Sequence, residues 1–346
     1  MNRFLLVRLG ALGDIVHAIP VAAALRRAFP AARIDWLVGA KHHEVLDLVP
    51  VIDRRLAFHD SSFVSAIREL RSARYDVTFD LQGLIKSAAL ARSSGAGRVI
   101  GFSSLYARER LARLFYTEVY DPGRGGLYDP RETRHVVEIN LGLLERIGLT
   151  AGRAEFPIDR IDSNAARQVA GQTGGRYAIL NPGAAWPNKR WPPARFAALA
   201  RTLRDRHGLV SAILWGPGEE ALAQEIAAGA PGAAIVSPKT TIADLVALAR
   251  GAALMVSGDT GPMHVASALG VPLVGLFGPT RPSRNGPIAP ADVTVTRDAA
   301  CQCHHLRQCK RGRMCLEDIE VEEVAGAVAR RLDSASDAAG AVANRG

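Results

Sequence analysis

The segment SGDTGPMHVASALG, residues 257–270, carries the side chains best suited to bind a charged substrate. An acid, a hydroxyl, a glycine and an imidazole occupy its turn: Asp259, Thr260, Gly261 and His264. The apolar run ending at Val256 predicts a strand before the turn, and the spacing after it predicts a helix. Free N–H groups in a first helical turn bind anions, and glycine lets the backbone approach a diphosphate. The turn is a candidate anion site; a core histidine is the alternative interpretation of His264.

A second polar loop, NPGAAWPNKRWP at 181–192, follows the apolar run that begins at Tyr177. Lys189 and Arg190 are expected at the carboxyl end of that strand, where an ammonium can lie beside phosphates. A solvated pair of charges is the alternative. The two tryptophans of the loop are expected to be hydrophobic anchors rather than cleft lining: Trp186 and Trp191.

A third turn, LGALGD at 9–14, joins an apolar strand to a helix near the start of the chain. Its spacing matches neither GxGxxG nor the lysine-containing P-loop, which disfavours a dinucleotide site, a triphosphate site and oxidoreductase activity. Asp14 fits a general base aimed into a cleft. It also fits a helix N-cap or first-turn acid. After the apolar run at 210–216, one of two acids, Glu219 or Glu220, is suited to accept hydrogen bonds from ribose hydroxyls. The alternative is an acid in the first turn of a helix.

These turns need a scaffold of parallel strands, and the sequence predicts one in each half of the chain. Strands at 3–8, 32–39 and 75–82 alternate with helical segments, and five further alternations begin at the strand 177–184. The pattern breaks around 150–175, which predicts an N-terminal domain over 1–165, a C-terminal domain over 166–332 and a flexible tail over 333–346. Two doubly wound α/β domains would bind ligands in a cleft at the carboxyl ends of their strands.

The composition is that of a globular protein in two domains. The 346 residues exceed what one core holds, with 48% hydrophobic and 22% charged residues. No run approaches the ~20 apolar residues that cross a bilayer, so a cytoplasmic protein is expected. The net charge of +9 admits nucleic acid, an anionic membrane or a phosphorylated substrate as the partner.

All four cysteines lie close together, at Cys301, Cys303, Cys309 and Cys315. Their spacing lacks the paired CxxC knuckles of common zinc sites, and a cytosolic protein seldom forms disulfides. Packing of a loop is the favoured interpretation, with a structural metal or redox pairing as the alternatives.

Four ordered motifs together resemble glycosyltransferase family 9, the ADP-heptose-dependent heptosyltransferases of the lipopolysaccharide inner core. The motifs are GALGDIVHAIP, DLQGLIKSA at 80–88, NPGAAWPNKRWP and SGDTGPMHVASALGVPLVGLFGPTRP. The resemblance spans residues 3–325. It implies a GT-B fold of two Rossmann-like domains facing a central cleft, with the acceptor in the first domain and the donor in the second. It further implies inversion at the anomeric carbon without a metal or other cofactor, and closure of the domains over the substrates.

The resemblance also implies roles for particular residues. Asp14 matches the catalytic base, Lys189 the lysine on the diphosphate and sugar, and Asp259 the acid that holds heptose hydroxyls. The diphosphate-facing turn matches Thr260, Gly261 and His264. Glu219 matches the ribose contact, with Glu220 left open by one residue of alignment slack, and Thr240 matches a position beside the adenine. The acceptor-side candidates are Arg8, Gly13, Gln82 and Lys86.

The implied partners are ADP-heptose, a Kdo-lipid A or inner-core acceptor and the cytoplasmic face of the inner membrane, with no nucleic acid. Within the family, DLQGLIKSA and ARERLARLFY resemble the first heptosyltransferase, which acts on Kdo-lipid A. The stretch 56–70 lacks the dense basic run of that type, and the segment from CxC to CLEDI is more like other branches. The resemblance therefore does not determine the identity of the acceptor. A relative with another nucleotide sugar or glycan acceptor, and a non-catalytic nucleotide-sugar binding protein, are the alternatives.

Overall fold

The protein is described by a computed structural model that covers residues 1–343 apart from 60, 62, 124, 130, 302–305, 307, 308, 310 and 311; from residue 336 onward only the backbone is described. The chain divides into two compact units, Met1–Asp159 and Arg160–Gly346. In the described part of the chain, no helix is both long enough and apolar enough to cross a membrane.

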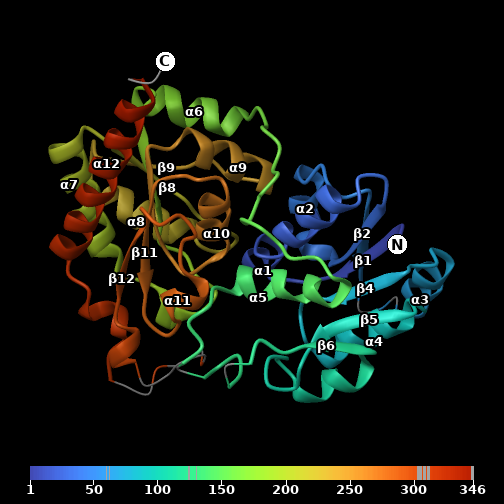
Figure 1. Cartoon of the computed structure of the whole chain (residues 1–346). Helices are drawn as coiled ribbons and strands as arrows, with labels where there is room; N and C mark the ends of the chain where they lie inside the picture. Colours follow the sequence, from blue (N-terminus) through green and yellow to red (C-terminus); the bar gives the residue numbers. More distant parts are fainter. Residues whose placement is uncertain are drawn as a thin grey trace. The chain divides into compact units, whose positions relative to one another are not determined.

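The N-terminal unit is built on one sheet of parallel strands in the order β3-β2-β1-β4-β5-β6 (Figure 1). The strands are β1 (Arg3–Val7), β2 (Arg33–Gly39), β3 (Arg54–Phe58), β4 (Val77–Asp80), β5 (Arg98–Phe102) and β6 (Glu118–Tyr120). β1 and β4 are buried along nearly their whole length because helices cover both faces of a parallel sheet. The strand order reverses between β1 and β4, so this unit is doubly wound and its ligand crevice is expected at their carboxyl ends.

The helical segments of this unit are short. They are α1 (Leu12–Val16), α2 (Ile19–Ala28), η1 (Ala40–Leu48), α3 (Phe63–Ser72), α4 (Ile85–Ser93), η3 (Arg110–Phe115), α5 (Val136–Gly142) and η4 (Leu143–Ile147), the η segments being 3₁₀ helices. A break at His17 and Ala18 separates α1 from α2, because Pro20 lacks an N–H donor and occupies the first turn of α2.

The C-terminal unit repeats the same topology, with the order β12-β11-β10-β7-β8-β9 and every pairing parallel. Its strands are β7 (Tyr177–Asn181), β8 (Val210–Ile213), β9 (Ala234–Val236), β10 (Leu254–Gly258), β11 (Leu273–Phe277) and β12 (Val293–Thr296). The order reverses between β7 and β10. The register pairs Asn181 with Ser257 at the carboxyl ends of these two strands.

Helices cover this second sheet on both faces. They are α6 (Asn164–Thr173), η5 (Pro187–Lys189), α7 (Pro193–His207), α8 (Glu220–Ala228), α9 (Ile242–Gly251), α10 (Gly261–Ala268), α11 (Pro282–Asn285), η6 (Asp298–Ala300), η7 (Cys315–Asp318) and α12 (Val321–Ala343). α12 runs beside α7 (Figure 1). Its backbone continues past the expected helix end at Leu332. The flexible tail and the domain boundary at 165 stay predictions.

Candidate active site

The C-terminal unit holds a buried charge cluster at the reversal point of its sheet. The Lys189 Nζ atom, on the loop after β7, lies 2.6 Å from Asp259 Oδ2, on the turn after β10. The other carboxylate oxygen, Oδ1, lies 3.0 Å from Nε2 of His264 in α10. The Asp259 side chain is only 5% exposed. Lys189 and His264 are therefore partners of one buried acid, and neither is a solvated surface charge or an isolated core residue.

This arrangement fixes the charge of Asp259. Burial by itself would raise the pKa of the carboxyl group, but His264 and Lys189 outweigh burial and hold the pKa well below its usual range. The cluster thus keeps an ammonium and a carboxylate in place at the ends of β7 and β10. Ligands of open parallel sheets bind at such reversal points.

Asn181 orients the turn that carries Thr260. Its Nδ2 atom donates to Ser257 Oγ and to Thr260 Oγ1, both at 2.9 Å. Thr260 is the N-cap residue of α10, so this amide fixes the start of a helix whose first-turn N–H groups are suited to bind an anion. Asn181 was not predicted as a site residue; it stood only within the motif NPGAAWPNKRWP. It could have been recognised as a candidate because it is a polar residue at the last position of a fully buried strand.

The loop after β7 approaches the end of β10 closely. A Cβ atom on Gly258 would lie 2.8 Å from the Lys189 carbonyl oxygen, so only glycine fits at this position. The Trp186 ring centre lies 4.7 Å from Lys189 Nζ, within cation–π range. Trp191 is buried and donates from Nε1 to the Ile319 carbonyl at 2.9 Å. Trp191 is thus an anchor as predicted, whereas Trp186 contacts Lys189.

Glu219 lies against the same loop, one strand farther out. It is the N-cap residue of α8, and its Oε2 atom accepts from the backbone N–H of Gly216 at 3.1 Å. A Cβ atom on Gly183 would overlap this carboxylate, so the acid rests on the backbone that follows β7. Glu220 is exposed and its Oε1 accepts from Gln224 on the same helix. The geometry therefore favours Glu219 over Glu220 as the acid nearest the reversal point.

The two remaining donor-side candidates lie at the same edge of the sheet. Thr240 is partly buried in the loop between β9 and α9, next to the N-cap residue Thr241. Gly261 is the first residue of α10. Thus the predicted residues follow β7, β8, β9 and β10 at their carboxyl ends.

A second charge cluster surrounds Asp14 in the N-terminal unit. Asp14 Oδ1 lies 2.8 Å from the guanidinium of Arg8, and Oδ2 accepts from Arg108 at 2.9 Å. The Asp14 side chain is 23% exposed, whereas Arg8 is buried at the end of β1 and also donates to the Leu81 carbonyl. Arg108 was not predicted as a site residue, because no motif linked it to an acid 94 residues earlier.

Two arginines change the acidity of this site. Burial by itself would raise the pKa of the Asp14 carboxyl, but Arg8, Arg108 and His17 outweigh it and hold the pKa well below its usual range. Burial in turn lowers the pKa of the Arg8 guanidinium to about 10. Asp14 is therefore ionised at neutral pH, with an arginine on each of its two carboxylate oxygens.

The ion pairs of Asp14 with Arg8 and Arg108 predict that the protein loses stability in acid. The folded pKa is below the unfolded one, so the unfolded chain binds the proton first and the stabilisation disappears as the pH falls below the ordinary value of 3.8. We expect Arg108→Gln to lower the free energy of unfolding by about 1–2 kcal/mol at pH 7, and the deficit to shrink as the pH falls from about 5 towards 2. Urea unfolding at several pH values measures this. Arg92→Gln, an exposed arginine on α4, is the control, and a deficit independent of pH would contradict the pairing.

The other acceptor-side candidates divide into two groups. Gln82 is buried after β4, and its Oε1 accepts from the Leu9 N–H at 2.7 Å, which braces the loop that leads to Asp14. Gly13 is buried within α1 beside the acid. Lys86 is exposed on α4, and its ammonium lies 5.7 Å from the centre of the Phe58 ring at the end of β3. The structure thus joins Gln82 and Gly13 to the Asp14 cluster and places Lys86 against another strand.

The cysteine segment forms a small packed cluster. Cys301 and Cys315 are buried together with Cys309 packed against them; Cys303 lies outside the described residues. Among the residues that the structure describes, no three Cys, His, Asp or Glu side chains are grouped to hold a metal ion. The described cysteines fit the loop-packing interpretation.

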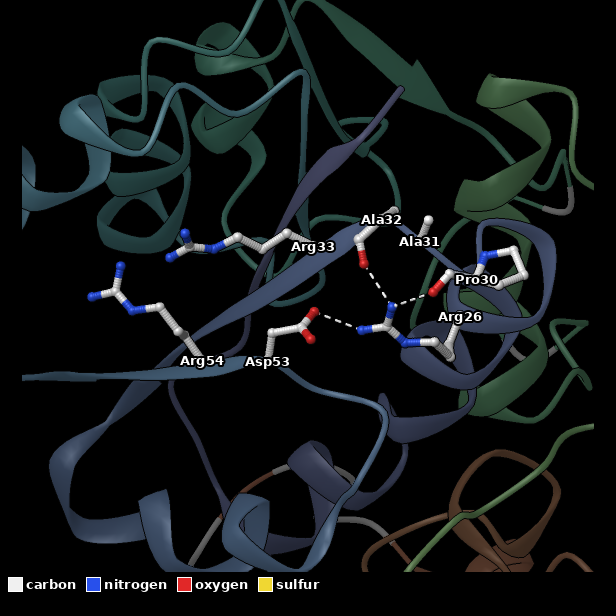
Figure 2. A pocket seen from close by; sticks show the side chains of 7 residues that line it. All are labelled: Arg26, Pro30, Ala31, Ala32, Arg33, Asp53 and Arg54. Carbon is white, nitrogen blue, oxygen red and sulfur yellow. Dashed lines mark hydrogen bonds and ion pairs between the residues drawn. The ribbon is translucent and has the colours of Figure 1, made fainter.

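A pocket of about 490 Å³ lies elsewhere, at the amino ends of β2 and β3 (Figure 2). Arg26 reaches into it from α2 and donates to Asp53 at 2.6 Å. The other two arginines of its lining are paired as well: Arg33 with Asp35 and Arg54 with Glu69. Since it opens at the amino ends of the strands, this pocket is a poor candidate for the site.

Solved structures share the whole architecture. The glycosyl transferase family 9 protein of Veillonella parvula superposes with a TM-score of 0.78 at 24% identity, over 96% of this chain and 97% of that one. The heptosyltransferase WaaC of E. coli, solved with ADP, gives a TM-score of 0.71 at 24% identity, over 97% and 98% of the two chains. Two six-stranded doubly wound units with this topology define the GT-B class of glycosyltransferase folds.

The sequence comparisons narrow the class to one family. The model for glycosyltransferase family 9 (heptosyltransferase) matches residues 63–314. Lipopolysaccharide heptosyltransferase 1 of Pseudomonas aeruginosa is 32% identical over 316 residues, covering 86% of this chain and 85% of that protein. The chain belongs to glycosyltransferase family 9, the heptosyltransferases.

Proposed function

We propose that the protein transfers heptose from ADP-heptose to an inner-core lipopolysaccharide acceptor. The observation that carries the proposal is the Lys189–Asp259–His264 cluster, which places one ammonium and one buried carboxylate at the reversal point of the C-terminal sheet. An ammonium suits the departing diphosphate, and a carboxylate suits sugar hydroxyls. The P. aeruginosa relative supports the choice of heptose and of a lipopolysaccharide acceptor.

The strand order supports one orientation of the donor along the carboxyl edge of the C-terminal sheet. Lys189 and Asp259 follow β7 and β10, Glu219 follows β8, and Thr240 follows β9. Neighbouring strands lie about 4.8 Å apart, so these positions span about 14 Å along the edge of the sheet. An extended nucleotide diphosphate sugar fits along this row. In our proposal heptose lies at Asp259, the diphosphate at Lys189 and the start of α10, the ribose at Glu219 and the adenine beside Thr240.

The proposed reaction is a single displacement with inversion. The acceptor hydroxyl oxygen forms a bond to the anomeric carbon as the bond from that carbon to the diphosphate oxygen breaks, and ADP leaves. Asp14 takes the proton of the attacking hydroxyl. Lys189 and the first-turn N–H groups of α10 stabilise the charge that gathers on ADP. Because the base and the donor groups belong to different units, closure of the units over the substrates is part of the proposal.

The same geometry supports a reaction without a metal. Lys189 and His264 each contact one oxygen of the Asp259 carboxylate, so the acid that a cation would use is already paired. The ammonium then supplies the positive charge that a divalent ion provides in other transferases.

On the acceptor side, Arg8 and Arg108 surround the proposed base and suit an acceptor that carries carboxylates or phosphates beside the reacting hydroxyl. Kdo-lipid A is such a molecule, and it is the first acceptor to test because the P. aeruginosa relative is a heptosyltransferase 1. A lipid acceptor also places the enzyme at the cytoplasmic face of the inner membrane.

The test is transfer by the purified protein. We expect ADP-heptose with Kdo-lipid A to give ADP and a product heavier by one heptose, and the rate of this reaction to be unchanged by EDTA. Lipopolysaccharide from cells that lack the protein should lack that heptose. ADP-glucose and UDP-sugars serve as donor controls, and heptosylated core as the acceptor control. No turnover of ADP-heptose with any core acceptor would contradict the proposal, and activity lost with EDTA and restored by Mg²⁺ would contradict the metal-independent step.

The Asn181 amide gives a prediction for donor binding. Asn181→Ala removes the donor to Thr260 and Ser257, so the turn before α10 loses its brace. We expect ADP to bind about 5–30-fold more weakly, which corresponds to about 1–2 kcal/mol. Calorimetric titration with ADP measures this. Asn164→Ala, in the first turn of α6 of the same unit, is the control; unchanged ADP affinity in Asn181→Ala would refute the bracing role.

A further inference from the structure

The short helix η3 presents large apolar side chains to solvent. Leu111 is 62% exposed and Leu114 is 76% exposed. In a 3₁₀ helix residues i and i+3 lie one above the other, so the two leucines form one ridge. Ile85, at the start of α4, is 40% exposed and adjoins η3, because its N–H donates to the Glu109 carboxylate at 2.6 Å. Large apolar side chains exposed together on one element are a candidate interaction surface.

A basic ridge runs beside the leucine ridge. Arg110 and Arg113 have the same three-residue spacing and are both exposed. Within the part of the chain that the structure describes, neither guanidinium makes a hydrogen bond or an ion pair. The neighbouring charges are already engaged: Glu109 with Ile85, and Arg108 with Asp14.

The remaining residues of the segment hold it rigidly on the unit. Ala112 is fully buried, and η3 packs along α4. Tyr116, which follows η3, is buried and donates to Asp80 Oδ2 at 2.7 Å. The exposure of Leu111 and Leu114 is therefore built into a fixed element and does not come from a loose loop.

We propose that the η3 patch, defined as Ile85, Arg110, Leu111, Arg113 and Leu114, docks the enzyme on the surface of an anionic lipid bilayer. Leucines enter the headgroup boundary, and guanidiniums bind lipid phosphates. A second copy of the chain is a poorer occupant, because two such patches would bring their arginines face to face. The purpose of docking rests on the proposed function, since a lipid-linked acceptor lies in the bilayer. Arg108, which binds Asp14, comes two residues before η3, so docking would hold the proposed base near that surface.

Vesicle co-sedimentation tests the patch without donor or acceptor. We expect the protein to bind phosphatidylglycerol-containing vesicles and to bind pure phosphatidylcholine weakly. Arg110→Gln with Arg113→Gln should reduce binding about 30-fold, since each basic side chain near the surface contributes about a factor of five. Leu111→Ser with Leu114→Ser should reduce binding by at least tenfold, both to phosphatidylglycerol-containing vesicles and to pure phosphatidylcholine vesicles.

Matched variants control for general charge and apolarity. Arg176→Gln with Arg330→Gln removes two exposed arginines from the C-terminal unit, and Val64→Ser removes an exposed apolar side chain from α3. Both should bind vesicles like the parent, and all variants should bind ADP like the parent. Equal losses in patch and control variants, or no loss in the patch variants, would overturn the proposal, as would a patch-dependent shift from dimer to monomer without vesicles. If the protein transfers no heptose but its vesicle binding depends on the patch, the docking proposal is supported and only the proposed function is contradicted.

Discussion

Asp14→Asn is expected to lower the rate of heptose transfer by about 10²–10⁴-fold while ADP binds as it does to the parent. The amide keeps the size of the carboxylate but cannot take the proton of the attacking hydroxyl. Steady-state kinetics with saturating donor and acceptor, together with calorimetric titration of ADP, separate the two effects. The loss belongs in kcat, because the proton moves only in the transition state.

The pH profile distinguishes a base from a structural acid. The low pKa of Asp14 keeps it ionised, so the parent should retain its rate well below pH 6, and the loss of rate in Asp14→Asn should be the same throughout that range. Because Asp14→Asn leaves Arg8 buried without its charged partner, a fall in stability of a few kcal/mol is also expected. Asp47→Asn, an exposed acid that pairs with Arg55, is the matched control. Transfer by Asp14→Asn within a few-fold of the parent would show that another group is the base.

Lys189→Met is expected to lower kcat by about 10²–10³-fold, because the departing diphosphate loses the ammonium that stabilises it. Methionine keeps much of the apolar stem and removes the ammonium, whose nitrogen lies 4.7 Å from the centre of the Trp186 ring. ADP should also bind more weakly, since the proposed function places its diphosphate at the same ammonium. Single-turnover transfer and ADP titration measure the two effects.

The controls separate lost chemistry from lost structure. Lys189→Met leaves Asp259 with His264 as its remaining close partner, so a lower thermal midpoint is expected and must be measured beside the kinetics. Lys189→Arg keeps the charge but changes a compact ammonium into a planar fork, and it should recover stability more fully than activity. Lys41→Met, an exposed lysine in the other unit, should behave like the parent. If Lys189→Met lost stability but kept kcat, the lysine would only pair with Asp259.

Local sequence patterns were sufficient for most of the interior strands and for the turns that follow them. Long apolar runs predicted β1, β2, β4 and the strands from β7 to β11, because helices bury both faces of these strands. The short strands β3, β6 and β12 were missed, and so was β5. β6 and β12 lie at sheet edges and have mixed exposure, so their sequences carry little apolar signal.

The sequence by itself determined the α/β class, the anion-suited turns and the residue types of both charge clusters. Only the tertiary structure decided which of these residues meet. Lys189 and Asp259 are 70 residues apart, and Arg108 is 94 residues from Asp14. They come together because each unit reverses its strand order at its first strand, which brings the carboxyl ends of β7 and β10, and of β1 and β4, side by side. Local spacing carries no record of strand order, since parallel pairing is set by contacts between distant segments. The physical reason that Lys189 is a buried partner of an acid, and not a solvated charge, therefore lies in the packing of the sheet.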